Sequence, residues 1–398
     1  MKHMFTSRLF LNISAVAALT LGAASLSSCD GNGIYEDLTP CSTDHKVSFY
    51  WNYNMLGADA FKENVHSMTI YGFNKDTGIL EFMLTERGDK LAQDGFAIDL
   101  DDVPEGDYDI VAWGGLDNSA RTDTTSNTEN FLIHDAVIGE TTRDDIYVKL
   151  EREVRADGSN HSENQLFDLF HGLNGEVKIY APNETPGETH HYQVPLKKNT
   201  NRINIILQQL SGEDMDASQF SYTVVDNNGT MNADNEVNGE APQITYHPFL
   251  TMEGVAGMGI DGYPDARTRA YTMAPKIPQF WLPGEEIPSY FKTRAGSDSQ
   301  FKPIKVAVAG ISISRLVTDH STALNVYNPD KELVCTIPLQ DYARILGTLH
   351  GGMGEQEYLD REDTYNLTFF LDKNNQWVNT AIIINSWKLL VKNGEFGN

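Results

Sequence analysis

The chain has 398 residues, of which 40% are hydrophobic and 10% aromatic, so it can bury the cores of two domains and is not a disordered polyelectrolyte. Its formal net charge is −26, with 56 acidic against 30 basic residues. A surface this acidic repels phosphate backbones, which argues against a nucleic-acid partner and suits a protein outside the cell.

The N-terminus has the features of a bacterial lipoprotein signal peptide, which we assign to residues 1–28. A basic start is followed by a mostly apolar run, residues 9–21, that is too short for a stable membrane anchor. A leucine and two serines then precede Cys29, as in a lipobox. We expect cleavage before Cys29, acylation of its thiol and a polar tether over residues 29–41. Several acyl chains would make the attachment durable. The alternative is an ordinary signal peptide in which Cys29 is incidental.

Two further cysteines, Cys41 and Cys335, lie far apart in the sequence. Neither forms a C-x-x-C pair, so zinc-knuckle and thioredoxin-like sites are not indicated. An oxidising compartment permits a disulfide between them, but their wide separation disfavours it, and two small buried thiols are the alternative.

Apolar and polar residues alternate through most of the first half, which predicts half-buried strands. Asn74 to Gly78 and Pro104 to Gly106 are turn sequences, and residues 116–145 form a polar surface connection. A single short helix is predicted, over residues 163–171. The predicted strands cover residues 47–55, 68–73, 79–84, 96–100, 108–112, 146–150, 177–180 and 192–196.

The second half continues the same pattern with one long interruption. Residues 253–300 carry many glycines and prolines without clear periodicity. The sequence predicts a short helix over residues 339–346. The predicted strands cover residues 201–210, 220–224, 305–316, 323–327, 332–337, 365–371 and 377–390. Many short strands with few helices indicate an all-β fold of two tandem antiparallel β-sandwich domains, residues 42–195 and 196–398.

No local motif predicts a catalytic residue, a cofactor site or a metal site. The glycine and serine run at residues 310–314 lacks a nucleophile elbow, and the glycines at 351–354 lack the Lys-Ser/Thr of a phosphate loop. The adjacent His190 and His191 would point to opposite sides of a strand, which does not suit a shared metal. A pair of facing carboxylates, as in a glycosidase, can be neither found nor excluded from one sequence.

The charged run Asp360, Arg361, Glu362 and Asp363 stands immediately before an alternating apolar segment. Paired carboxylates beside an arginine suit acid–base catalysis, but they also suit a charged turn at the start of a strand. We predict a structural turn in which Arg361 bridges nearby carboxylates. No other segment offers an obvious catalytic partner.

Several blocks together resemble a known family. Cys29 followed by IYEDLTPC, then VSFYWNYN, IYGF with NKDTG, and VPEGDYDIVAWGG are similar to the first half of Bacteroidales fimbrial anchor and accessory lipoproteins. LFHG, VPLKKNTNRINIIL, ISISRL, QEYLDREDTYNLTFFL and IIINSWKLL resemble the second half in the same order. The ordered set is far more specific than any one block.

The resemblance implies two transthyretin-like sandwiches and a surface-exposed lipoprotein of the outer membrane that tethers a fimbrium and limits its length, supporting adhesion. It implies fimbrial subunits as partners, joined by strand donation, and no catalysis. A surface glycan-binding lipoprotein is the alternative, and an unrecognised hydrolase is a further one. Of five tryptophans that could stack on sugars, most lie on alternating apolar faces, and Trp281 in the long connection is the best remaining candidate.

Overall fold

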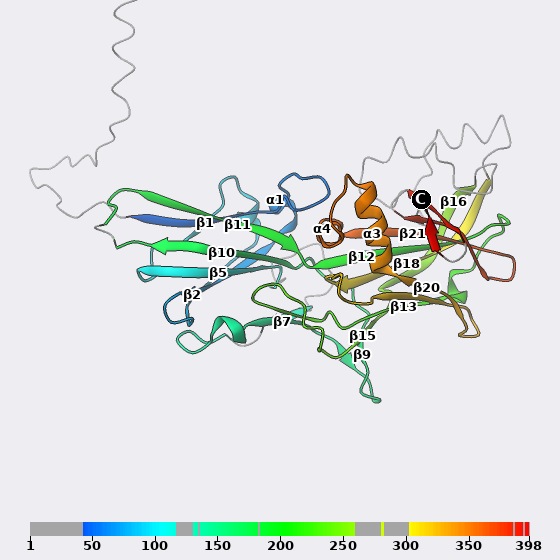
Figure 1. Ribbon diagram of the computed structural model, residues 1–398, viewed down its shortest axis with the longest axis horizontal. Helices are drawn as coiled ribbons and strands as arrows, with labels where there is room; N and C mark the ends of the chain where they lie inside the picture. The colour runs from blue at the N-terminus through cyan, green and yellow to red at the C-terminus, as the bar shows by residue number, and fades with distance from the viewer. Residues whose placement is uncertain are drawn as a thin grey trace, which may run out of the picture. The chain divides into compact units, whose positions relative to one another are not determined.

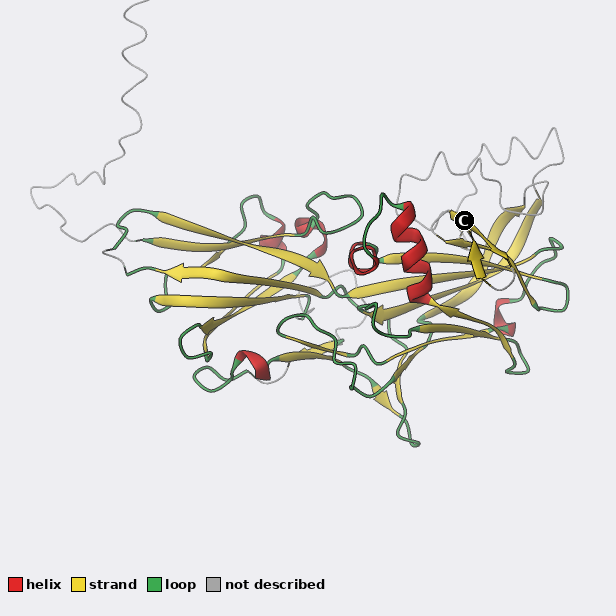
Figure 2. Ribbon diagram, in the orientation of Figure 1, coloured by secondary structure: helices red, strands yellow, loops and turns green. Residues whose placement is uncertain are grey.

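The protein is described by a computed structural model that covers residues 43–116, 130–133, 136–181, 184–258, 280–281, 302–384, 387–392 and 395–397. Most of these residues lie in strands and few lie in helices, so the predicted all-β class is confirmed (Figure 2). In this part of the chain, no helix combines the length and apolarity required to cross a bilayer.

The first sheet has seven strands in the order β3-β2-β5-β10-β11-β1-β4 (Figure 1). In β1, buried residues alternate with partly exposed ones, as the sequence period of two predicts. Strand β2 is almost entirely buried, since both faces of this part of the sheet are covered. The strands are β1 Asp44–Tyr50, β2 Ser67–Asn74, β3 Leu80–Arg87, β4 Ile98–Asp99, β5 Gly106–Gly114, β10 Phe170–Ile179 and β11 Thr189–Lys198.

The second sheet has eight strands in the order β17-β16-β18-β12-β21-β22-β23-β24. Its strands β12 and β21 are parallel, and the long crossover that a parallel pair needs contains the helices α3 (Leu339–Leu349) and α4 (Glu355–Arg361). The strands are β12 Thr200–Gln209, β16 Leu250–Met258, β17 Phe280–Trp281, β18 Lys302–Ser314, β21 Thr364–Leu371, β22 Trp377–Ile384, β23 Trp387–Lys392 and β24 Glu395–Gly397.

Two smaller sheets combine strands from before and after residue 195. A six-stranded sheet has the order β20-β19-β13-β15-β9-β8, in which β9 and β15 are parallel, and a three-stranded sheet has the order β14-β7-β6. The strands are β6 Phe131–Ile133, β7 Tyr147–Leu150, β8 Glu153–Val154, β9 Asn160–Ser162, β13 Ser221–Asp226, β14 Thr230–Asn232, β15 Ile244–Tyr246, β19 Ala323–Tyr327 and β20 Leu333–Pro338.

The helices among the described residues are short. Besides α3 and α4, this part of the chain has one helical turn, α1 (Phe61–Asn64), and three 3-10 helices, Asp89–Ala92, Arg143–Asp145 and Ala217–Gln219. The helix predicted over residues 339–346 is confirmed as α3.

The helix predicted over residues 163–171 is wrong. Residues 163–169 are irregular, and β10 begins at Phe170. The apolar residues are buried as their spacing suggests, but the backbone is bound to distant segments. The Phe167 amide donates to Asn130 Oδ1 at 2.8 Å, and the Leu169 carbonyl accepts from the Asn199 amide at 2.7 Å. These tertiary hydrogen bonds replace the helical ones.

The division of the chain into compact units does not follow its division into sheets. Residues His45–Ile179 and His191–Asn398 form one compact unit, which contains both hydrophobic cores. The other contains Asp44 and Tyr180–His190 among its described residues. Within the latter, the Asp44 amide donates to the Glu188 carbonyl at 3.0 Å, and the Tyr180 and His190 rings lie 4.6 Å apart.

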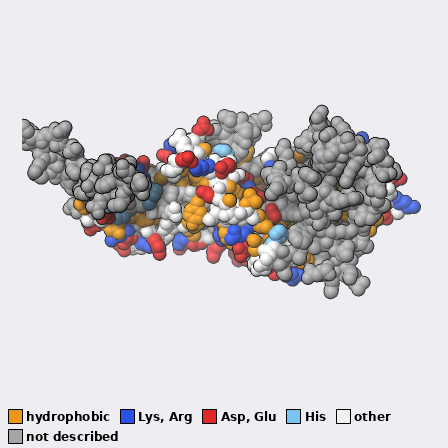
Figure 3. All heavy atoms as spheres, turned by 90° about the horizontal axis from the view of Figure 1, so that it is seen from above, with side chains coloured by type: hydrophobic (Ala, Val, Ile, Leu, Met, Phe, Trp, Pro, Cys, Tyr) orange, Lys and Arg blue, Asp and Glu red, His pale blue; other side chains and the backbone are white. Residues whose placement is uncertain are grey.

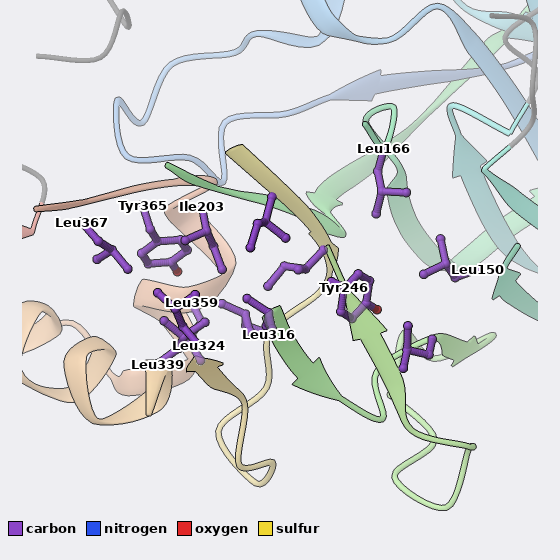
Figure 4. Close-up of a cluster of buried hydrophobic side chains, with 14 of the residues drawn as sticks. Leu150, Leu166, Ile203, Tyr246, Leu316, Leu324, Leu339, Leu359, Tyr365 and Leu367 are labelled. Carbon is purple, nitrogen blue, oxygen red and sulfur yellow. The ribbon is translucent and has the colours of Figure 1, made fainter. Parts of the chain in front are cut away.

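The larger core joins side chains from several sheets and both helices of the crossover. Figure 4 shows Leu339 of α3 and Leu359 of α4 in the same cluster as Ile203 of β12. Each fully buried side chain of this size contributes about 1.5–3 kcal/mol relative to an exposed one. The cluster therefore holds α4, and with it the charged run that begins at Asp360, against the larger core.

Candidate functional site

The four predicted turn residues divide between a helix and a connection. Asp360 and Arg361 form the last turn of α4, and Glu362 and Asp363 link it to β21, which begins at Thr364. The prediction of a charged group at the start of a strand fits this placement, but half of the group is helical.

Arg361 does not bridge its three neighbours. Its Nε donates to Glu357 Oε1 at 2.8 Å, one helical turn earlier, and its Nη1 donates to the Asn54 carbonyl at 3.3 Å. Its guanidinium carbon lies 4.2 Å from the centre of the Tyr53 ring, within the range of a cation–π contact. Arg361 thus connects α4 to the loop that follows β1.

Asp360 is bound instead by Arg315, which directly follows β18. Arg315 Nε and Nη2 donate to Asp360 Oδ1 at 3.0 and 2.8 Å, and Nη2 reaches Oδ2 at 3.0 Å. Gln356 Nε2 donates to Oδ1 at 2.9 Å, and Lys197 Nζ donates to Oδ2 at 3.2 Å. The Asp360 side chain is only 2% exposed. Both carboxylate oxygens are therefore occupied by donors, which leaves neither aimed at a substrate.

The other end of Arg315 fixes the backbone between β14 and β15. Its Nη1 donates to the Asn235 carbonyl, and Asn235 has a positive φ of 64°. The Asn235 and Asn199 side-chain amides exchange two hydrogen bonds, of 3.1 and 2.6 Å, and both residues are buried. Asn199 is the single residue between β11 of the first sheet and β12 of the second.

Lys198, the last residue of β11, makes a second set of ion pairs. Its Nζ lies 2.8 Å from Asp363 Oδ2, 3.0 Å from Asp168 Oδ1 and 5.7 Å from the Trp51 ring centre. Burial disfavours the ammonium, but the two carboxylates outweigh it and raise the pKa of Lys198. Gly115, with φ of 86°, packs on the Asp168 carbonyl, where a Cβ would come within 2.0 Å.

Lys197 and Arg361 both lie over the Tyr53 ring, Lys197 Nζ at 5.2 Å from its centre. Burial, followed by the charges of Asp360 and Glu357, raises the pKa of the Tyr53 hydroxyl. The hydroxyl thus stays protonated well above neutral pH, as a structural tyrosine does.

These eight charged residues form what we call the junction cluster. It consists of Arg315, Arg361, Lys197, Lys198, Asp168, Glu357, Asp360 and Asp363. Four positive and four negative charges balance, and they join β11, β18, α4 and the entry to β21. The arrangement stabilises the connection from the first sheet to the second and presents no pair of free carboxylates for acid–base chemistry.

Sequence inspection missed the central cation of this cluster. Arg315 stands at the end of a strongly apolar strand, and Lys197 and Lys198 are adjacent basic residues in a chain of net charge −26. Basic residues in these positions indicate that each has an acidic partner. They do not reveal which one, because Asp360 lies more than forty positions after Arg315.

The remaining candidates give no binding platform among the described residues. Trp51 and Trp113 are buried in the cores, as predicted, and Trp377 is partly buried against the larger core. The side chain of Trp281 lies outside the described residues. Figure 3 shows charged side chains of both signs interspersed with hydrophobic ones on the face seen from above.

Of the three cysteines, only Cys335 lies among the described residues. Cys29 and Cys41 lie outside the described residues. Cys335 in β20 is a free buried thiol, and burial raises its pKa to about 12, so it is unreactive in the folded protein. Among the residues that the structure covers, no group of three or more histidine, cysteine or acidic side chains is arranged to hold a metal ion.

Comparison with known proteins identifies relatives over nearly the whole chain. A family model described as fimbrillin-A associated anchor proteins Mfa1 and Mfa2 matches residues 38–391. No curated protein sequence matches the chain.

Solved structures share the fold. A candidate adhesin from Bacteroides thetaiotaomicron is 26% identical, with a TM-score of 0.66 over 89% of this chain and 100% of that one. A candidate polysaccharide-binding protein from the same species is 22% identical, with a TM-score of 0.64 over 88% and 99% of the two chains. The fimbrial anchor protein Mfa2 from Porphyromonas gingivalis is 15% identical, with a TM-score of 0.56 over 88% and 100%.

Proposed function

The chain belongs to the family of fimbrillin-A associated anchor proteins, and from this premise we propose that it tethers a fimbrial shaft to the outer membrane and limits its length. As a family member it has a fimbrial anchor or accessory role at the cell surface and associates with fimbrial subunits. The single observation that carries the proposal is the family match from residue 38 to residue 391.

Attachment to the membrane is proposed to pass through a lipid on Cys29. The support comes from the sequence alone: a basic start, a short apolar run and the Leu26-Ser27-Ser28 triplet before the cysteine. Lipid anchoring suits an anchor, because a subunit held in the membrane can end a fibre but cannot be carried outward with it.

Assembly is proposed to occur by strand donation, in which an extended segment of one subunit adds to a sheet of another. The support is the all-β fold, whose sheets have edge strands such as β3 in the first sheet. An unpaired edge offers backbone donors and acceptors to an incoming strand. We propose no catalytic role, because family membership indicates a structural protein and Asp360 is fully engaged by donors.

Replacement of Cys29 by alanine tests the attachment. Cys29→Ala should move the protein from the membrane fraction to the soluble or periplasmic fraction. Cys41→Ala, twelve positions further on, is the matched control and should remain in the membrane fraction. If Cys29→Ala stays in the membrane after a carbonate wash, the lipid does not reside on Cys29.

Affinity purification of the native protein tests the partner. Co-purifying fimbrillin-like subunits are expected. Retention of the protein on a polysaccharide gel, with no fimbrial subunit recovered, would favour the surface glycan-binding alternative instead.

A further inference from the structure

The hairpin of β8 and β9 is attached to the six-stranded sheet by a very short pairing. Strand β9 pairs in parallel with β15 through three residues, with His161 opposite Thr245. The His247 amide donates to the Ser162 carbonyl at 2.8 Å, just beyond the pair. The Asn160 side chain adds one bond, to the Gln243 carbonyl at 3.2 Å. Three parallel residue pairs are a weak attachment by themselves, so side chains must contribute.

The side chains at this attachment form a continuous hydrogen-bonded chain. His161 Nδ1 and His247 Nε2 are 2.8 Å apart, and the two rings stack with centres 5.0 Å apart. His161 Nε2 lies 2.7 Å from Ser159 Oγ, and Ser159 Oγ donates to Asp157 Oδ1 at 2.5 Å. His161 is buried, and the chain links β9 to the end of β15.

The direction of these bonds fixes the tautomers. The single Ser159 proton goes to the Asp157 carboxylate, so Ser159 Oγ must accept from Nε2–H of His161. The Nδ1 of neutral His161 is then an acceptor, and it accepts from Nε2–H of His247. Every donor in the chain points toward the carboxylate.

The chain keeps all of its hydrogen bonds with one added proton but not with two. A proton on Nδ1 of His247 leaves the bond to His161 intact, because Nε2 still donates. A second proton on Nδ1 of His161 places N–H against N–H at hydrogen-bond distance, and it sets two positive charges side by side.

Charged groups on the hairpin surround the pair. Glu153 in β8 and Glu163 after β9 favour a charged His247, whereas Arg155 in the turn opposes it. Arg155 and Glu163 are paired with each other at 2.5 Å, which limits the effect of both. Burial, only partly offset by Glu163, lowers the pKa of His247. A lowered pKa means that the unfolded or detached segment binds protons more readily, so attachment weakens as the pH falls below about 6.5.

We propose that the hydrogen-bonded His161–His247 pair is an acid-sensitive latch that holds the β8–β9 hairpin on the six-stranded sheet. Double protonation breaks the pair and releases β9 from β15. Release removes β8 and β9 together, so the edge of the sheet moves from β8 to β15 in acid. In acid, the subunit would then offer β15 in place of β8 as the edge strand available for strand addition.

Hydrogen exchange of the full chain, followed by mass spectrometry between about pH 7.5 and about pH 4.5, tests the latch. Corrected for intrinsic pH dependence, exchange in peptides covering residues 159–163 and 244–248 should accelerate at least about tenfold in acid, because the segment opens locally. His247→Gln keeps an N–H donor for His161 but does not titrate, so its exchange should change less than about twofold. His191→Gln, an exposed histidine on β11, is the matched control and should respond like the parent.

Imidazole titration of the parent by nuclear magnetic resonance provides a second readout that no variant can confound. The two rings should titrate as a coupled pair, so that the signals of both report each protonation step. Independent titration of the two rings, or acid-accelerated exchange that persists in His247→Gln, would overturn the proposal.

Discussion

Asp360→Asn is the most informative single substitution in the junction cluster. It preserves shape but removes the charge that Arg315 and Lys197 bind, and it turns an amide group toward at least one of their donors. Because the Asp360 side chain is 2% exposed and that of Arg315 is 10% exposed, the arginine would be left buried without its counter-ion. Removal of one partner from a buried pair costs about 3–5 kcal/mol.

The matched control is Asp363→Asn, three residues later in the same connection. Its side chain is 37% exposed and pairs with Lys198, so the loss should be about 1 kcal/mol or less. Urea denaturation gives both free energies of unfolding. In thermal melting, Asp360→Asn should lower the midpoint by roughly 10 °C if about 150–250 residues unfold together.

A double replacement separates the cost of an orphaned charge from the value of the pair. Arg315→Met combined with Asp360→Leu removes both charges and should recover much of the stability that Asp360→Asn loses, because an apolar pair of similar volume is often as stable. If Asp360→Asn costs no more than Asp363→Asn, the buried pair does not hold the junction and this reasoning is refuted.

Three further predictions follow from the fold. Fragments 42–195 and 196–398 should each show β-type circular dichroism. Each should be less stable than in the whole chain, because β7 and β9 lose their partners β14 and β15. Two unfolded fragments would contradict a boundary near residue 195. Burial lowers the pKa of His171 to about 3, so the free energy of unfolding should fall as the pH drops below about 6.5. Between pH 6.5 and 5, urea denaturation should show His171→Gln losing about 1–2 kcal/mol less of this free energy than the parent loses. Equal losses in the two proteins would contradict the assignment. The parent should hydrolyse no chromogenic glycoside, ester or peptide, whereas turnover abolished by Asp360→Asn or Glu362→Gln at unchanged melting temperature would make the charged run catalytic.

The strands were the most predictable part of the fold. Strand β1 alternates because one of its faces is buried and the other is not, and this leaves a direct record in the sequence, although the strand ends at Tyr50 and not at the predicted residue 55. Strand β21 alternates only at its start, because both of its faces are buried toward Leu371. Helix α4 left no such record, since it has only seven residues and one of its three buried positions is the charged Asp360. The helical spacing at residues 163–171 misled because long-range hydrogen bonds, not local preference, decide that segment.

The chemistry of the site depended on contacts that are distant in the sequence. Lys197 and Asp360 are separated by 163 positions and His161 and His247 by 86, so no local pattern could join them. The two parallel strand pairs were also not predicted, because register and direction are set by the crossover and not by alternation. Attachment through Cys29 is inferred from the sequence alone, and the described residues begin only at position 43.

Electron microscopy of fimbriae on cells that carry Cys29→Ala tests the anchor account most directly, with Cys41→Ala as the matched control. We predict that the Cys29→Ala cells shed fimbriae into the medium and that the shed fibres are longer than those of the parent, whereas Cys41→Ala cells retain fibres of normal length. Fimbriae that remain attached at unchanged length, with the Cys29→Ala protein confirmed to have left the membrane fraction, would contradict a role as the anchor.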